Sequence, residues 1–162
     1  MITEIKKNEW PKFYRKFNAT NLYRPARLSV VNPDGSRTVI CPAPFMGIAL
    51  TRQGRKVNGI QFLAGQADAE KIIEPIMTIA EPTRVVLEQD TDGSDRHLRI
   101  QSSTDDREVV LELTGQRESS QMLVEKVAYS LYERRGYAPG NDRGDWYEAE
   151  QKVKEVETQL TR

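Results

Sequence analysis

The chain has 162 residues, of which 38% are hydrophobic and 30% are charged, and its formal net charge is zero. This length and apolar content suit one modest hydrophobic core, or one domain with an appended element. The sequence has no opening stretch of the signal-peptide type, no run near the roughly 18 apolar residues that a membrane span requires, and a single cysteine, Cys41. We therefore expect a cytoplasmic protein that has no disulfide and does not bind a membrane.

The zero net charge hides an uneven distribution along the chain. Residues 1–60 carry eleven Lys and Arg against three acids, a net charge of +8, whereas residues 61–114 carry five against twelve, a net charge of −7. Such asymmetry either orients a charged partner or reflects two sets of strands that attract one another in the folded protein. Nucleic-acid binding is thus an alternative function, although no groove-reading motif is present. The basic residues that could contact a phosphate backbone are Lys12, Arg15, Lys16, Arg24, Arg27, Arg55 and Lys56.

Four aromatic residues at helical spacing predict a short amphipathic helix near the start of the chain. Asn8 is the candidate N-cap, and Pro11 suits the first helical turn, where its missing N–H is not needed. We expect the aromatic side of this helix to pack on a sheet. The four residues are Trp10, Phe13, Tyr14 and Phe17.

Between residues 26 and 114, apolar residues alternate with polar ones and turn residues recur at intervals, which is typical of β-strands. The run Asn32-Pro33-Asp34-Gly35 predicts a type I turn between the first two strands. Residues 67–81 fit either a strand or a helix interrupted at Pro75. The fold class is thus α+β, in which residues 1–114 form an antiparallel meander or a partly closed barrel covered by the first helix. Seven strands are expected, within residues 26–31, 37–41, 46–50, 60–62, 85–87, 98–100 and 109–113.

Residues 90–95, Asp-Thr-Asp-Gly-Ser-Asp, bring three carboxylates together and invite comparison with a calcium loop. An EF-hand requires glycine at its sixth position and glutamate at its twelfth, whereas here the glycine is fourth and the twelfth residue is Gln101. We therefore expect a hairpin turn. The chain offers no nucleophile with a base, no metal-ligand cluster and no phosphate loop, so we expect no catalytic residue, no metal and no cofactor.

Helical spacing returns after Gly115 and predicts a C-terminal two-helix hairpin in residues 115–162. Ser119 or Ser120 can cap the start of the first helix, and Arg134, Arg135 and Gly136 form its C-terminal end. Asp145, with Glu148 three positions on, resembles a capping box at the start of the second helix. The second helix carries a narrow apolar seam of Trp146, Ala149, Val153, Val156 and Leu160, and the first a wider stripe of residues 123, 124, 127, 128, 131 and 132.

The hairpin resembles a family of short bacterial helical-hairpin domains, domain of unknown function 2934, over about residues 119–160. The residues that carry this resemblance are Ala128-Tyr129, Leu131-Tyr132-Glu133, Gly136, Trp146 and Ala149-Glu150. The front of the chain, about residues 2–113, is similar to a second uncharacterised bacterial family, domain of unknown function 5335. This second resemblance rests on Glu9-Trp10, Phe13, Pro44, Gly47-Ile48, Ile79, Pro82, Val85, Gly93, Leu98 and Ile100. Neither resemblance implies an activity or a catalytic residue.

The apolar stripe of the first hairpin helix is wider than one neighbouring helix can cover, so it predicts contact with the β-rich domain, with a second copy of the chain or with another protein. We therefore expect a non-enzymatic interaction or regulatory module that binds a protein partner or itself through the hairpin. Trp146 either fills the gap between the helices or, if partly exposed, anchors the partner. The expected partner-binding residues are Tyr129, Tyr132, Trp146, Val153 and Val156.

Overall fold

The computed structural model describes residues 1–65, 73–104, 106–115 and 120–161. In these residues antiparallel sheets are combined with an N-terminal helix and two C-terminal helices, which confirms the α+β class. The helices are α1 (Trp10–Asn21), which follows a 3-10 turn (Lys7–Glu9), α2 (Gln121–Arg134) and α3 (Asp142–Thr161). The strands are β1 (Ile2–Ile5), β2 (Pro25–Val31), β3 (Arg37–Pro44), β4 (Gly47–Gln53), β5 (Lys56–Gly65), β6 (Ile73–Ala80), β7 (Pro82–Gln89), β8 (Asp95–Ser102) and β9 (Glu108–Leu113).

The strands form two sheets, and neither closes into a barrel within the described ranges. The larger has the order β1-β7-β8-β9-β2-β3, and the smaller has the order β4-β5-β6. All the strand pairs are antiparallel. The chain passes from the smaller sheet to the larger at Glu81, whose φ of 48° lies in the left-handed region that non-glycine residues seldom adopt.

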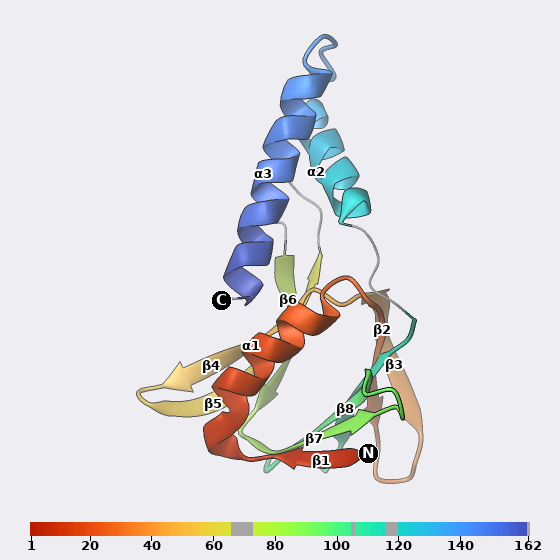
Figure 1. The fold of residues 1–162 in the computed structure, drawn as a ribbon, viewed down its shortest axis with the longest axis vertical. Coiled ribbons are helices and arrows are strands. Elements are labelled where there is room, and N and C mark those ends of the chain that lie inside the picture. The colour runs from red at the N-terminus through yellow and green to blue at the C-terminus, as the bar shows by residue number, and fades with distance from the viewer. Residues whose placement is uncertain (66–72, 105, 116–119, 162) are drawn as a thin grey trace.

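Helix α1 lies against both sheets and joins them into one core (Figure 1). Its Trp10, Tyr14 and Phe17 are all buried, as the aromatic spacing predicts. Trp10 also donates its indole N–H to the carbonyl of Ile5 at 3.0 Å, which fixes β1 beside the helix. The larger sheet adds Leu28, Val30, Val85, Leu87, Leu98, Ile100, Val109, Leu111 and Leu113 to this core, and the smaller adds Ile48, Ile60, Phe62 and Ile79.

Two strands exceed the seven expected, and both are edge strands. β1 pairs only with β7, and three of its four side chains are exposed, so it has no alternating apolar face. β6 resolves the ambiguity of residues 73–80 in favour of a strand, whereas residues 66–72 lie outside the described residues. Pro75 is accommodated because β6 is at the edge of its sheet, where a missing N–H costs no pairing.

The helix ends match the predicted caps only in part. Asn8 lies inside the 3-10 turn, and Glu9 holds the N-cap position of α1 without a side-chain bond. Ser120 holds the N-cap position of α2 as predicted, although its side chain makes no capping bond, and Ser119 lies outside the described residues. The capping-box prediction at Asp145 is wrong, because α3 begins at Asp142. The prediction for the end of α2 is confirmed by Gly136, whose φ is 69°.

The two C-terminal helices form the expected hairpin, which stands away from the β-rich part and touches it with the last turns of α3 and with Leu123 at the start of α2 (Figure 1). The predicted seam is confirmed, since Ala149 and Val153 are buried between the helices with Trp146 and Val156 beside them. Within the described ranges, no helix is both long enough and apolar enough to cross a membrane.

Candidate functional site

A groove runs between α2 and α3 on one face of the hairpin. Its volume is about 530 Å³, and its floor is formed by Val124, Val153 and the half-buried Trp146. The indole N–H of Trp146 donates to Glu150 Oε1 at 2.6 Å, so the ring is held at the edge of the groove. The remaining lining is polar and consists of Ser120, Gln121, Glu150, Lys154 and Glu157.

The residues expected to bind a partner fall into two groups. Trp146 and Val153 line the groove, although Val153 is only 2% exposed, and Val156 lies in the hairpin core. Tyr129 and Tyr132 do not line the groove; their rings lie 6.1 Å apart on α2, and Tyr129 is 55% exposed. The structure therefore separates an apolar groove at Trp146 from a pair of tyrosines on α2, of which Tyr129 is exposed and Tyr132 is half-buried.

The wide apolar stripe of α2 is mostly covered within the chain. Val124, Val127 and Leu131 are buried against α3. Leu123 packs on a small cluster of Leu22, Tyr23 and Met46 in the β-rich part. The large hydrophobic side chains of the hairpin that stay exposed are Met122 and Tyr129 on α2, Tyr137 in the loop and Tyr147 on α3.

The tip of the hairpin is held by a partly buried ion pair. Arg135 follows the last residue of α2 and pairs with Asp145 in the first turn of α3. Arg135 also donates from Nη1 to the carbonyl of Ala138 at 3.0 Å, inside the loop that joins the helices. Asp145 is 5% exposed, so this contact is screened from water and fixes the angle between the helices.

The base of the hairpin is fixed to the β-rich part by α3. The hydroxyl of Tyr23 donates to Glu157 Oε1 at 2.7 Å, and Asn18 Nδ2 donates to the carbonyl of Leu160 at 3.3 Å. Leu160 also lies against Gly47, where any added Cβ would be 2.9 Å from Leu160 Cδ2. Gly47 therefore lets the last turn of α3 approach the start of β4.

The structure disperses the basic residues that could follow a phosphate backbone. Lys12, Arg15 and Lys16 are exposed on α1, and Arg27 is exposed on β2. Arg55 and Lys56 lie at the β4–β5 turn, where Lys56 Nζ is 3.4 Å from a carboxylate oxygen of Glu81. Arg24 belongs to a different site, because its guanidinium is bound inside a cavity.

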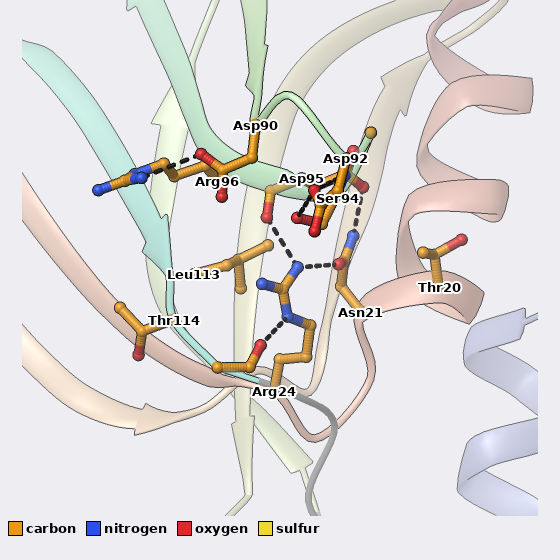
Figure 2. Close-up of a pocket in the computed structure, with 12 residues that line it drawn as sticks. Thr20, Asn21, Arg24, Asp90, Asp92, Ser94, Asp95, Arg96, Leu113 and Thr114 are labelled. Atoms are coloured by element: carbon orange, nitrogen blue, oxygen red, sulfur yellow. Dashed lines mark hydrogen bonds and ion pairs between the residues drawn. The ribbon is translucent and has the colours of Figure 1, made fainter.

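That cavity lies where the end of α1, the β7–β8 turn and the end of β9 meet (Figure 2). Its volume is about 640 Å³. Hairpin geometry at the turn is as expected, because the N–H of Gly93 bonds to the carbonyl of Asp90 at 2.9 Å. The lining is Thr20, Asn21, Arg24, Asp90, Asp92, Gly93, Ser94, Asp95, Arg96, Leu113, Thr114 and Gly115.

A buried polar network forms the wall of the cavity. Asn21 is fully buried and donates from Nδ2 to Asp95 Oδ2 at 2.7 Å. Arg24 donates from Nη1 to Asn21 Oδ1 at 2.8 Å and to the carbonyl of Asp95 at 2.7 Å. Its Nε donates to the carbonyl of Gly115 at 3.0 Å. These bonds hold three separate elements around one guanidinium, as Figure 2 shows.

The aspartates of this cavity differ in their partners. Asp90 pairs with Arg96 at 2.9 Å, and Asp95 accepts hydrogen bonds at both of its carboxylate oxygens, from Asn21 and from Gln89. Asp92 accepts only from Ser94, at one oxygen, from the hydroxyl at 2.6 Å and from the N–H at 2.9 Å. The hydroxyl bond is the main reason why the pKa of Asp92 is lowered, and the charge of Arg24 contributes.

Sequence reasoning did not find this cavity. It identified residues 90–95 as a turn and counted Arg24 among possible phosphate contacts. The residues that meet there are remote in the chain, since Arg24 and Asp95 are 71 positions apart. No spacing rule connects the end of a helix with a turn so far along the sequence.

The comparisons with known proteins concern the hairpin. Neither a curated protein nor a solved structure matches the chain. The expected similarity of residues 2–113 to domain of unknown function 5335 stays a prediction. Residues 121–155, which comprise α2, the loop and most of α3, match the family described as "Protein of unknown function (DUF2934)", and the hairpin is therefore similar to that family.

Proposed function

We propose that the protein is a non-enzymatic interaction module that binds a protein partner through the groove beside Trp146. The observation that supports this function is a half-buried tryptophan beside a groove of about 530 Å³, on a hairpin that stands away from the β-rich part. Tryptophan is enriched among the residues that dominate the energy of protein interfaces, where it is surrounded by contacts that exclude water.

The shape of the groove favours an amphipathic helix as the partner. Two packed helices present a groove that a third helix can occupy with its apolar ridge. Val124 and Val153 supply the apolar floor, and the rim is charged, with Glu150 and Lys154 at its edge. A partner helix would place one large apolar residue against Trp146 and polar residues along the rim.

The test is site-specific photocrosslinking in cells, with a crosslinking amino acid at Gln121 on the rim of the groove. The same amino acid at Gln53, which is exposed at the β4–β5 turn, is the control. We expect a discrete protein adduct from position 121 and none from position 53. A species of twice the chain mass would identify the partner as a second copy.

Two substitutions decide whether the adduct depends on the groove. Trp146→Ala and the rim variant Lys154→Glu should each reduce the adduct at least tenfold, whereas Tyr147→Ala, at a neighbouring side chain that is 65% exposed, should leave it unchanged. Circular dichroism confirms that each variant keeps its helices. An adduct that persists in both groove variants, or that disappears with nuclease, refutes the proposal, and the second result favours nucleic acid.

A further inference from the structure

The cavity beside the β7–β8 turn is a preformed polar pocket. Its volume of about 640 Å³ lies within the range of roughly 300 to 1,000 Å³ that small-molecule pockets occupy. Asn21 and Asp95 are 0% and 9% exposed, and both have hydrogen-bond partners. Because these two wall residues are buried and hydrogen-bonded, they hold the neighbouring groups in place before any ligand arrives.

Arg24 brings a positive charge to this cavity without an ionic partner among the described residues. Its three bonds go to neutral oxygens, the side-chain oxygen of Asn21 and the carbonyls of Asp95 and Gly115. Nε and Nη1 make these bonds, which leaves the two N–H groups of Nη2 for a ligand (Figure 2). The Nη2 group of this partly buried guanidinium can donate a charge-assisted hydrogen bond, which favours a ligand carboxylate.

Asp92 brings the opposite charge, and the β2–β3 turn holds a matched aspartate that has the same local hydrogen bonds but different surroundings. In the β2–β3 turn, Asp34 accepts from Ser36 at 2.9 Å and 2.6 Å, the same two distances that Asp92 has with Ser94. Asp34 is exposed and lines no pocket among those described here, whereas Asp92 lines the cavity with Arg24. Both bonds from Ser94 go to Oδ1 of Asp92, so among the described residues its second carboxylate oxygen is open to a cationic donor in the cavity.

The other charges of the cavity are already compensated. Asp90 is paired with Arg96, and Asp95 accepts hydrogen bonds at both oxygens. Asp92 therefore disfavours a simple anion, and Arg24 disfavours a simple cation. We infer that this cavity binds a small zwitterion of the amino-acid class, with the ligand carboxylate on Arg24 Nη2 and the ligand ammonium on Asp92.

The test is an NMR titration of the full chain with each of the twenty common amino acids. We expect saturable shifts at the amides of Gly93, Ser94 and Gly115 with at least one of them. For that amino acid, removal of the ammonium in its N-acetyl derivative, or of the carboxylate in its methyl ester, should each weaken binding at least tenfold. Inorganic phosphate and glucose are the anionic and uncharged controls, and neither should bind comparably.

The β2–β3 turn and the β7–β8 turn, which share these hydrogen bonds, supply a matched pair of variants. Asp92→Asn should weaken binding about tenfold or more, because it removes the charge that faces the ammonium, whereas Asp34→Asn should have no effect. Both positions are exposed, so the fold tolerates either change equally. The inference is overturned by the absence of saturable shifts up to tens of millimolar, by equal binding of phosphate or glucose, or by equal effects of the two substitutions.

Discussion

Asn18 connects three parts of the molecule through one side-chain amide. It is 4% exposed, and its amide pairs with both backbone groups of Ile48 at 2.9 Å, as a neighbouring strand would do. The same Nδ2 reaches the carbonyl of Leu160 at the end of α3. An asparagine in a helix interior usually weakens the helix, so its presence here is explained by the edge of β4 that it satisfies.

We predict that Asn18→Ala destabilises the protein by about 2 to 4 kcal/mol, because it leaves the buried N–H and carbonyl of Ile48 without partners. Urea unfolding followed by circular dichroism measures this change. Asn8→Ala, in the exposed 3-10 turn, is the control and should change the unfolding free energy by less than about 0.5 kcal/mol. Equal stability of the two variants would show that Asn18 contributes nothing beyond its place in the helix.

Ser36 in the β2–β3 turn and Ser94 in the β7–β8 turn predict that the stability of the protein depends on pH. The Ser36 hydroxyl is the largest reason why the pKa of Asp34 is below its usual 3.8, and Ser94 acts in the same way on Asp92. Folding lowers both pKa values. Each turn therefore contributes its full stability above the usual carboxyl pKa of 3.8 and loses it as the pH falls through the lower folded pKa. Ser36→Ala should raise the pKa of Asp34 alone, and Ser94→Ala that of Asp92 alone. Carbon-13 NMR titration of the carboxyls measures both, and a shift at the unmodified turn would contradict this account.

At the scale of single elements, α3 shows how a tertiary contact displaces a local motif. The sequence places Asp145 and Glu148 at the spacing of a capping box, but the N–H of Asp145 already bonds to the carbonyl of Asn141 at 3.0 Å inside the helix. The Asp145 side chain is taken by Arg135 instead. The helix therefore begins at Asp142, four residues before Trp146, where the capping box would start it.

We predict that Asp145→Ala destabilises the hairpin by about 2 to 4 kcal/mol, because it leaves the partly buried Arg135 without its counter-charge. Thermal unfolding of the helical circular dichroism signal measures the effect. Glu148→Ala is the matched control, since its carboxylate makes only an exposed contact with Lys152 at 4.0 Å and should cost less than about 0.5 kcal/mol. A larger loss of stability from Glu148→Ala than from Asp145→Ala would instead support a capping box at these two residues.

The elements that the sequence predicted are those with a regular apolar pattern. Alternation in most of the expected strands and helical spacing in the three helices were sufficient, because these elements bury one face, whereas β3, whose Val39 is 50% exposed, followed from the turn before it. β1 could not be predicted, since its exposed side chains give no pattern and it exists only because β7 offers an edge. β6 was ambiguous because Pro75 is compatible with a strand only at the edge of a sheet, and edges are not visible in a sequence.

For the molecule as a whole, the division into two sheets and the site geometry depend on contacts between remote residues. The exit from the smaller sheet at Glu81 and the network of Asn21, Arg24 and Asp95 have no local signature. Trp146 was found because it stands one turn inside a helix with clear spacing, and it lies where both helices and the groove meet. Periodicity therefore predicted the hairpin and the seam that contains Trp146, whereas the groove and the cavity required the tertiary structure.

The docking of the hairpin is testable at the same scale. We predict that Leu160→Ala destabilises the last turns of α3 by about 1 to 2 kcal/mol, because Leu160 packs on Gly47 and on the cluster of Leu22, Tyr23 and Met46. Amide hydrogen exchange of residues 156–160 should accelerate roughly tenfold, while that of residues 124–131 stays unchanged. Met122→Ala, at an exposed side chain of α2, should leave both segments unchanged. Faster exchange throughout the hairpin would instead show that its two ends unfold together.

The two tryptophans of the chain lie in different parts of the molecule. Trp10 is 1% exposed in the core that α1 shares with the sheets, and Trp146 is half-buried at the groove of the hairpin. Each part thus contains its own intrinsic fluorophore, one in an apolar and one in a partly aqueous environment. A variant that keeps only Trp146 would report by fluorescence on the hairpin, and a variant that keeps only Trp10 would report on the β-rich core, so changes in the two parts can be followed separately.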